Sequence, residues 1–324
     1  MIISVAHKFF AVLLVSVAVA VKPASADEAR LKPFILGTAP AGDMEQTVVA
    51  VKGALKVQGF EEAGSYSPYA GATVIVVTNM ELKTAAARAK NGGFGVGQRV
   101  AVTDYKGKLQ VSYMNPAYLG AAYGLGKLEI TTAKLKAALG AVREFGAVDG
   151  LTAEALAPGT YHYMVGMPYF LQVDTHAHYP DYKTALAAVE TGLAAGKGGT
   201  KKVYRIDLPG REICVFGVGI VTGDGIDKGA KDTDKEIMDI LDWQELRITA
   251  ALPYELMVRG GEVISMRGRY RIALHSPDTK MAGAHGFTKI MSAPGGIKSA
   301  LNAVAGSEQV KNDQISEVKQ GPAK

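Results

Sequence analysis

Hydrophobic and polar positions along the first half of the chain show two periods in turn, the two-residue period of strands and the 3.6-residue period of helices. Residues 72–78 form a β-branched run that is too short and too rich in valine for a helix, so they predict a strand. Residues 99–105 and 108–113 alternate in polarity across Lys106-Gly107, which predicts a β-hairpin. Apolar residues at helical spacing predict a helix over residues 46–57. The same patterns predict a strand over 62–66, helices over 82–89 and 132–145, and a helix from about Ala117.

The second half of the chain repeats this succession with different loops. Helices are predicted over 183–194 and from Thr233, which has the capping-box spacing with Glu236. Two strands, over 202–207 and 212–220, and a hairpin, over 254–259 and 263–272, are also predicted. Eight residues recur 162 positions later without a gap, which is the mark of an internal repeat. These are Ala122, Gly124, Lys127, Lys136, Ala138, Leu139, Ala141 and Val142, matched by Ala284, Gly286, Lys289, Lys298, Ala300, Leu301, Ala303 and Val304.

This pattern predicts an α+β fold built from two related small α/β units. Each unit is expected to be a mainly antiparallel sheet covered by helices, the first over residues 27–150 and the second over residues 181–306. Residues 151–180 lie between them, and the strand-like stretch 161–173 is interpreted as a linker strand that joins either sheet or bridges the two. Residues 307–324 are polar and charged, which predicts a disordered tail.

Residues 1–26 have the pattern of a secretory signal peptide. Lys8 supplies a basic start, residues 9–21 form an apolar run, and Ala24-Ser25-Ala26 fits the small-x-small cleavage rule. The run is shorter than the roughly 20 residues that a helix needs to cross a bilayer. We therefore expect cleavage after Ala26, delivery to the periplasm and no stable membrane anchor afterwards. An uncleaved helix that tethers the chain to the membrane is the alternative.

The charge balance excludes some classes of partner. Lys and Arg outnumber Asp and Glu by 36 to 31, and cleavage would remove two lysines and no acid. Basic residues are interspersed with acids along the chain, whereas nucleic-acid binders concentrate them on one face.

Cys214 is the only cysteine, so an intramolecular disulfide and a thiolate zinc cluster are excluded. Its strand-like surroundings predict a buried structural thiol.

Four segments of the first unit carry a resemblance to a known family. They are the helix 48–60 with its Gln-Gly-Phe ending, the strand 98–105 with Gly107, the strand 109–113, and Asn115-Pro116-Ala117-Tyr118. Over about the first third of the mature chain, the sequence resembles the bacterial domain-of-unknown-function 302 family, and the second unit does so only through the repeat. The resemblance implies a compact α+β unit that tends to pair. It implies no established reaction and no catalytic residue.

The most suggestive chemistry lies between the two units. His162, Met164, Met167, His176 and His178 supply imidazole and thioether groups, which suit copper, and copper or haem handling is one hypothesis for this segment. In a regular strand, His176 and His178 would project to the same face. The alternatives are methionines that fill the core and histidines in a solvated loop.

Other residues are weaker candidates. Tyr113, Tyr118 and His285 are candidate pocket residues, and His285 stands where the first unit has Tyr123. The aspartates between Thr222 and Asp234 lack the spacing of a calcium loop, so we expect a solvated loop there. No familiar nucleophile motif is present. A strongly shifted pKa of His275 or His285 within a cleft would favour an enzyme.

The sequence favours a periplasmic, non-enzymatic ligand-binding or accessory protein of unknown specificity. Its partner would be a small ligand or a periplasmic protein, held in a groove between the units, and no nucleic acid is expected. An enzyme with an unfamiliar site and a structural or oligomerising module, such as a homo-oligomer, are the alternatives. The aromatic residues expected to line the groove are Tyr66, Tyr69, Tyr113, Tyr118, Tyr161, Tyr163 and Tyr169.

Overall fold

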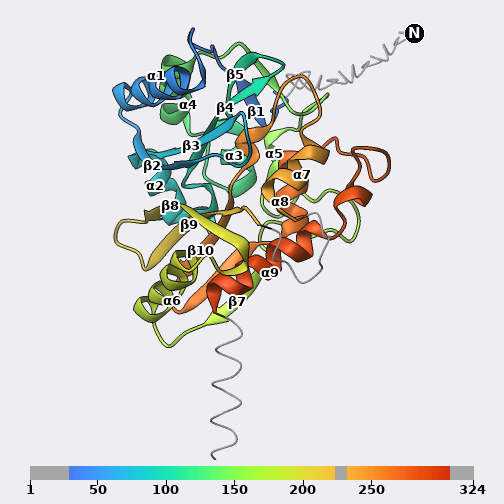
Figure 1. The fold of residues 1–324 in the computed structure, drawn as a ribbon. Coiled ribbons are helices and arrows are strands. Elements are labelled where there is room, and N and C mark those ends of the chain that lie inside the picture. The colour runs from blue at the N-terminus through green and yellow to red at the C-terminus, as the bar shows by residue number, and fades with distance from the viewer. Residues whose placement is uncertain (1–28, 223–231, 307–324) are drawn as a thin grey trace, which may run out of the picture.

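Two antiparallel sheets form the centre of the fold (Figure 1). The computed structural model describes residues 29–222 and 232–306. The first sheet has the strand order β2-β3-β4-β5-β1-β6, and all its neighbouring strands are antiparallel. Its strands are β1 (Phe34–Leu36), β2 (Glu61–Tyr66), β3 (Ala72–Thr78), β4 (Gln98–Tyr105), β5 (Lys108–Met114) and β6 (Arg143–Phe145).

The second sheet has the order β7-β11-β10-β9-β8 and is also antiparallel. Its strands are β7 (Val173–His178), β8 (Thr200–Asp207), β9 (Ile213–Ile220), β10 (Tyr254–Arg259) and β11 (Glu262–Met266). The fold is therefore α+β, as the sequence predicted. Five strands of the first sheet, β2-β3-β4-β5-β1, occur in the same order as β8-β9-β10-β11-β7. Descent of the two halves from one duplicated unit stays a prediction.

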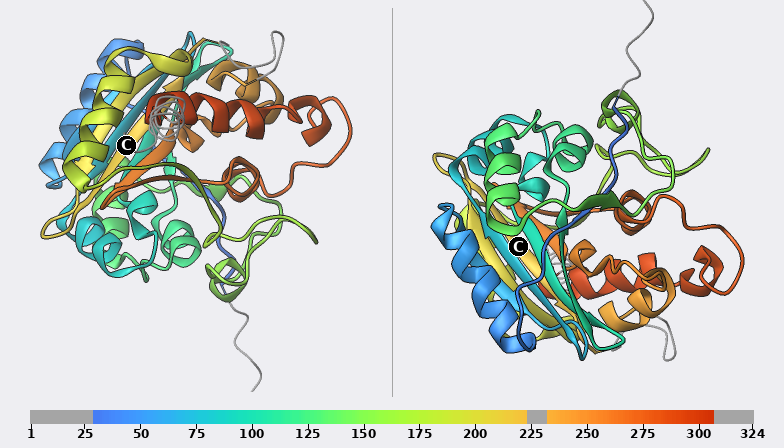
Figure 2. Two further views of the ribbon diagram at one scale, coloured as in Figure 1. Left: turned by 90° about the horizontal axis from the view of Figure 1, so that it is seen from below. Right: turned by 90° about the horizontal axis from the view of Figure 1, so that it is seen from above.

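Helices cover the outer faces of the sheets and fill the space beside them. α1 (Met44–Val57) packs with α4 (Glu129–Leu139) on the first sheet, and α6 (Tyr182–Ala194) packs with α9 (Ala293–Ala305) on the second. α1 and α6 lie on the same side of the strands (Figure 2). The other helices are α2 (Met80–Arg88), α3 (Pro116–Tyr123), α5 (Ala153–Leu156), α7 (Asp234–Leu241) and α8 (Gly268–His275). No helix in the described ranges combines the length and apolar character that a membrane crossing requires.

Side-chain alternation along the first sheet produces two cores. Ile75 and Val77 on β3 point toward α1 and α4, where they pack with residues such as Leu55. Val74 and Val76 point to the opposite face and join a larger core that runs through the second half of the molecule. Both faces of β3 are therefore buried, which explains why its sequence is a continuous apolar run.

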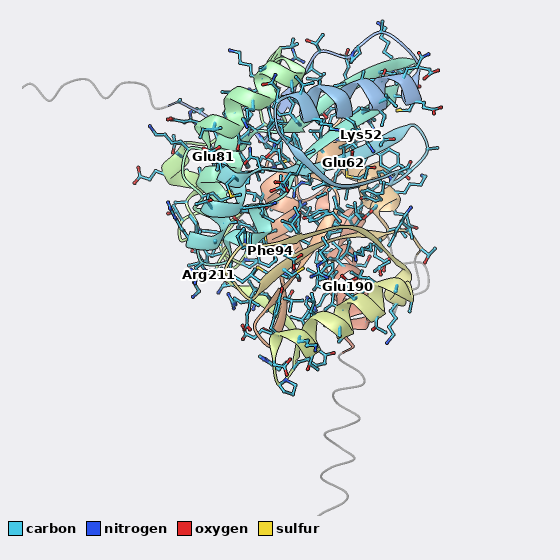
Figure 3. All side chains as sticks on the ribbon, turned by 90° about the vertical axis from the view of Figure 1, so that its left-hand side faces the viewer. Lys52, Glu62, Glu81, Phe94, Glu190 and Arg211 are labelled. Atoms are coloured by element: carbon cyan, nitrogen blue, oxygen red, sulfur yellow. The ribbon has the colours of Figure 1, made fainter. Side chains whose placement is uncertain are left out.

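The two halves meet at their edge strands. β2 lies against β8, where a Cβ on Gly64 would come within 2.0 Å of the carbonyl oxygen of Val203. The 3-10 helix η1 (Gly92–Gly95) of the first half packs against β9 and β10 of the second. Its Phe94 is buried where the two halves join, as Figure 3 shows. Glycine at position 64 is therefore required by the close approach of the two backbones.

Three predicted elements differ from the structure. The strand predicted over 161–173 is absent from residues 161–172; the strand β7 begins at Val173 and belongs to the second sheet. The second hairpin strand ends at Met266, and the following residues form α8. The helix predicted over 132–145 ends at Leu139, after which the chain forms the short strand β6.

The 162-residue repeat holds in only part of the structure. It aligns α4 with α9, so that buried Leu139 corresponds to buried Leu301. In the order of elements, α3 corresponds to α8. An offset of 162 residues would place the start of α8 ten residues later than its actual start at Gly268. The last residue of α3 is Tyr123 and the last of α8 is His275, so His275, not His285, occupies the position of Tyr123. The predicted signal peptide with Ala26 and the predicted tail 307–324 lie outside the described residues.

Candidate functional site

A cleft of about 1060 Å³ opens on the surface of the second half. One wall is the segment 162–174 that leads into β7. The opposite wall is formed by Arg267, Gly268 and Arg269 at the start of α8, and by residues 291–299 at the start of α9. The cleft therefore lies between the segment 151–180 and the second predicted unit, not between the two predicted units.

Glycines allow the two helix starts to approach each other. A Cβ on Gly268 would lie 2.9 Å from the Cα of Pro294, closer than real side chains come. Neither Arg267 nor Ser292, the N-cap residues of α8 and α9, forms a side-chain cap hydrogen bond. The first turns of two helices, with their partial positive charge, thus lie at the same cleft.

Some charged side chains of the cleft form ion pairs, and others do not. Lys298 forms an ion pair with Asp174 at 2.8 Å between Nζ and Oδ1. Asp232 is buried against the first turn of α9, where a Cβ on Gly296 would come within 2.2 Å of the Asp232 Cβ. Arg267 and Arg269 are exposed, and neither guanidinium has a hydrogen-bond or ion-pair partner within the described ranges. The cleft therefore carries surplus positive charge.

The five predicted metal ligands are not brought together. Only His162 and Met167 line the cleft, and His162 Nδ1 lies 2.8 Å from the carbonyl oxygen of Met164. The Met164 side chain is exposed at the surface. Among the described residues, no group of three or more His, Cys, Asp or Glu side chains could hold a metal ion. Copper or haem handling by this segment therefore stays a prediction, and only His162 and Met167 of its five residues share the cleft.

A β-bulge explains why the two strand histidines separate. Ala177 pairs with Val263 and Thr175 with Ile264, which leaves His176 as the extra residue of β7. His176 is buried, while His178 is exposed. The two ring nitrogens of His176 lie 2.6 Å from Asn302 Oδ1 and 2.8 Å from Ser265 Oγ. Burial lowers the pKa of His176, so its ring is a neutral, fully bonded core group.

The predicted pocket residues also separate. Tyr113 and Tyr118 are buried in the core, and their hydroxyls donate to the carbonyl oxygens of Gly140 and Leu274, both at 2.8 Å. His285 stacks on Trp243 at 4.7 Å between ring centroids and lines a second pocket of about 260 Å³ between the two halves. Of the seven tyrosines expected in a groove, Tyr169 alone lines the larger cleft.

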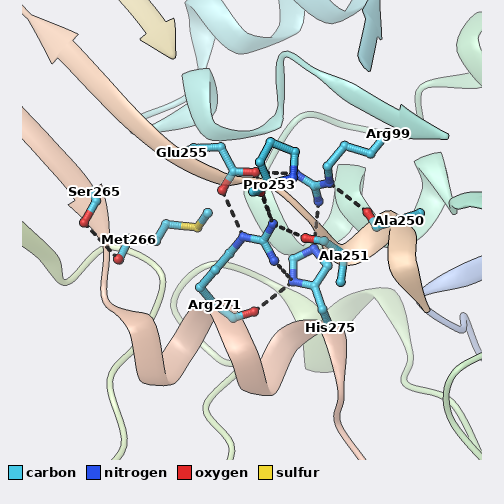
Figure 4. Close-up of polar contacts among 9 residues, drawn as sticks. All are labelled: Arg99, Ala250, Ala251, Pro253, Glu255, Ser265, Met266, Arg271 and His275. Atoms are coloured by element: carbon cyan, nitrogen blue, oxygen red, sulfur yellow. Dashed lines mark hydrogen bonds and ion pairs between the residues drawn. The ribbon is translucent and has the colours of Figure 1, made fainter. Parts of the chain in front are cut away.

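A buried cluster of charged side chains joins the two halves (Figure 4). Arg99 on β4 and Arg271 on α8 both bond to Glu255 on β10, and each of these side chains is at most 3% exposed. The Arg271–Glu255 contact is 2.9 Å between Nε and Oε2. Arg99 also donates through Nε to the carbonyl oxygen of Ala250 at 3.1 Å. One carboxylate thus serves two guanidiniums.

His275 completes this cluster as a neutral group. Its Nε2 lies 2.8 Å from Nη2 of Arg99, and its Nδ1 lies 2.9 Å from the carbonyl oxygen of Arg271. Burial, Arg271 and Arg99 together lower the pKa of His275 well below its usual value. The shift that would favour an enzyme is present, but His275 is fully buried and lines neither pocket described above. We therefore interpret the cluster as a structural contact that holds the two halves together.

Two aspartates expected in or beside a solvated loop are also buried. Asp232 contributes to the cleft wall, and Asp234 accepts a hydrogen bond from the hydroxyl of Tyr66 at 2.8 Å. Burial raises the pKa of Asp234 to about 7. Asp242, whose pKa burial raises to about 6, accepts from the Ile248 backbone N–H at 2.7 Å. Residues 223–231, with the other aspartates of that loop, lie outside the described residues.

No family model, curated protein or solved structure matches the chain. The resemblance of the first unit to the domain-of-unknown-function 302 family stays a prediction. The cleft and the buried cluster therefore have to be interpreted from their own geometry.

Proposed function

We propose that the chain is an exported ligand-binding protein whose cleft holds a small anionic molecule. The observation that carries the proposal is the pair of arginines, Arg267 and Arg269, which line a cleft of about 1060 Å³ and have no acidic partner within the described residues. Guanidinium groups bind carboxylates and phosphates through two parallel hydrogen bonds, which favours planar or tetrahedral anions.

Two further features support an anion over a cation or a neutral ligand. The uncapped first turn of α8 directs backbone N–H groups toward the same region, and such N–H groups favour negative charge. The lining side chains carry three basic groups, Arg267, Arg269 and Lys298, against the two acids Asp174 and Asp232. Because Asp174 already pairs with Lys298, the lining keeps a net positive charge, which favours an anion over a cation.

Thermal unfolding in the presence of small anions tests this proposal. Phosphate, succinate, benzoate and hexanoate are compared with the neutral benzamide and hexanamide on the mature chain. A ligand at 100 times its Kd adds about 2.7 kcal/mol to the free energy of unfolding. We expect at least one anion to raise the melting temperature, and the neutral compounds to leave it unchanged.

Charge-matched variants separate the cleft from the rest of the surface. The double variant Arg267→Gln/Arg269→Gln should lose the response. The control Lys108→Gln/Lys183→Gln removes the same charge from exposed residues outside the cleft and should keep it. An equal response of both double variants, or no response of the unmodified chain to any anion, would show that the cleft is not an anion site.

A further inference from the structure

Exposed apolar side chains gather on the lip of the cleft. Val165 is 93% exposed and Met291, on the opposite wall, is 70% exposed. Met164, Tyr169 and Leu171 are also exposed and belong to the same segment as Val165. Exposed apolar groups that gather in one place commonly mark a binding surface, whereas single ones need no explanation.

This segment is held in place by its own contacts. Tyr161 donates its hydroxyl hydrogen to the carbonyl oxygen of Ala273, and Phe170 stacks on Tyr123 at 5.0 Å between ring centroids. His162 packs edge-on against Tyr169 at 4.8 Å. The apolar side chains between these anchors therefore point outward on a fixed loop, next to the cleft that the arginines line.

We propose that the ligand is an amphiphile with one anionic head and one apolar chain, bound as a single molecule. This inference rests on the proposed function, because Arg267 and Arg269 would hold the head. The apolar chain would lie against Val165, Met167 and Met291, which are on the two walls of the same cleft. Positive charge and apolar surface at one cleft complement the two parts of such a molecule.

The size of the cleft suits this class of ligand. Pockets for small molecules have volumes of roughly 300–1,000 Å³, and about 1060 Å³ accommodates a head group with a chain of several carbons. Each methylene that the apolar wall covers should strengthen binding by up to about fourfold. Affinity should therefore rise steadily with chain length until the chain extends beyond the lip.

The test is calorimetric titration of the mature chain with butanoate, hexanoate, octanoate and decanoate, each below its micelle-forming concentration. Octan-1-ol and octyltrimethylammonium have a similar chain without the anionic head. We expect affinity to increase from butanoate to decanoate and both octyl controls to bind far more weakly. Arg267→Gln/Arg269→Gln should weaken all four acids by a similar factor.

Variants of the lip test the apolar part alone. Val165→Ser/Met291→Ser should reduce the gain per methylene while leaving the affinity for butanoate unchanged. Val57→Ser is the matched control, because Val57 is 81% exposed on α1 and does not line the cleft. This control should keep the dependence on chain length, since the substitution changes exposed apolar surface elsewhere.

The outcomes separate this inference from the proposed function. Binding of all four acids with equal affinity would overturn the amphiphile and leave an anion site in place. Failure of every acid to bind would overturn the amphiphile, and the proposed function would fall with it only if phosphate, succinate and benzoate also left the melting temperature unchanged. Binding to vesicles of phosphatidylglycerol without binding of any free acid would also overturn the inference, because the lip would then contact a membrane surface and not a single chain.

Discussion

Replacing Glu255 with glutamine should destabilise the protein more than removing Arg99, one of the two arginines that bind it. Glu255 is the only acid in the buried cluster, and it neutralises one of the two guanidinium charges of Arg99 and Arg271. Glutamine has nearly the same shape but no charge, so Glu255→Gln leaves two buried cations without a counter-charge. Arg99→Met removes one cation and leaves Glu255 paired with Arg271.

The structure sets the expected magnitudes. Removing one partner of a buried ion pair costs about 3–5 kcal/mol of unfolding free energy, and Glu255→Gln should fall in this range. In Arg99→Met, Glu255 keeps its contacts of 2.9 and 3.2 Å with Arg271. The main loss is then the hydrogen bond from Arg99 to the carbonyl oxygen of Ala250. Leaving that buried oxygen without a donor costs about 1–3 kcal/mol of unfolding free energy. Because the two residues are in contact, the double variant should cost less than the sum.

Urea unfolding at neutral pH, followed by far-ultraviolet circular dichroism and by fluorescence of Trp243, measures these differences. Glu212→Gln is the control, since Glu212 is exposed and its side chain makes no hydrogen bond within the described ranges; it should change stability by less than about 0.5 kcal/mol. A smaller loss in Glu255→Gln than in Arg99→Met would refute the charge argument. So would a loss in Glu255→Gln no larger than that of the control.

Three further predictions concern other buried groups. Burial raises the pKa of Asp234 to about 7. The native state therefore binds a proton on the Asp234 carboxyl more tightly than the unfolded chain does. The stability that the protonated carboxyl contributes at acid pH is lost as the pH rises from about 4 to about 7. Asp234→Asn should therefore gain in melting temperature relative to the unmodified chain between pH 5 and pH 8; a relative loss would contradict this sign. Cys214 is buried and burial raises its pKa, so a thiol reagent should label it only in urea, and rapid labelling of the native protein would show otherwise. Gly64→Ala would force a methyl group against Val203 and should cost about 1–3 kcal/mol in urea unfolding, whereas Gly53→Ala, on α1 with open space around it, should be neutral or stabilising.

Local sequence signals predicted most strands and helices because the side-chain pattern of each element reflects which of its faces is buried. β3 was recognisable from its β-branched run, and the hairpin of β4 and β5 from its alternation around Gly107. Residues 161–172 were misread as a strand because several of their apolar side chains pack into the core without any strand pairing. The rings of Tyr161 and Phe170 both pack against Tyr270, and no ladder of backbone hydrogen bonds joins either residue to a sheet.

The sites were harder to predict because they depend on contacts between distant residues. Arg99 and Glu255 are 156 positions apart, and nothing near either residue in the chain indicates its partner. A signal did exist, since Glu255 is a charged residue within the otherwise apolar start of β10. His176 and His178 were expected on one face, and only the strand register reveals the bulge that separates them.

α8 connects the surface of the protein to its interior. Arg267 and Arg269 stand at its start, beside the cleft, while Arg271 and His275 lie further along in the cluster that binds Arg99. Eight residues of helix span about 12 Å, a distance over which a helix behaves as a stiff rod. Displacement of its first turn therefore moves the groups that hold the two halves together. Under the proposed function, a ligand that shifts this helix on binding would be thermodynamically coupled to the contacts between the halves.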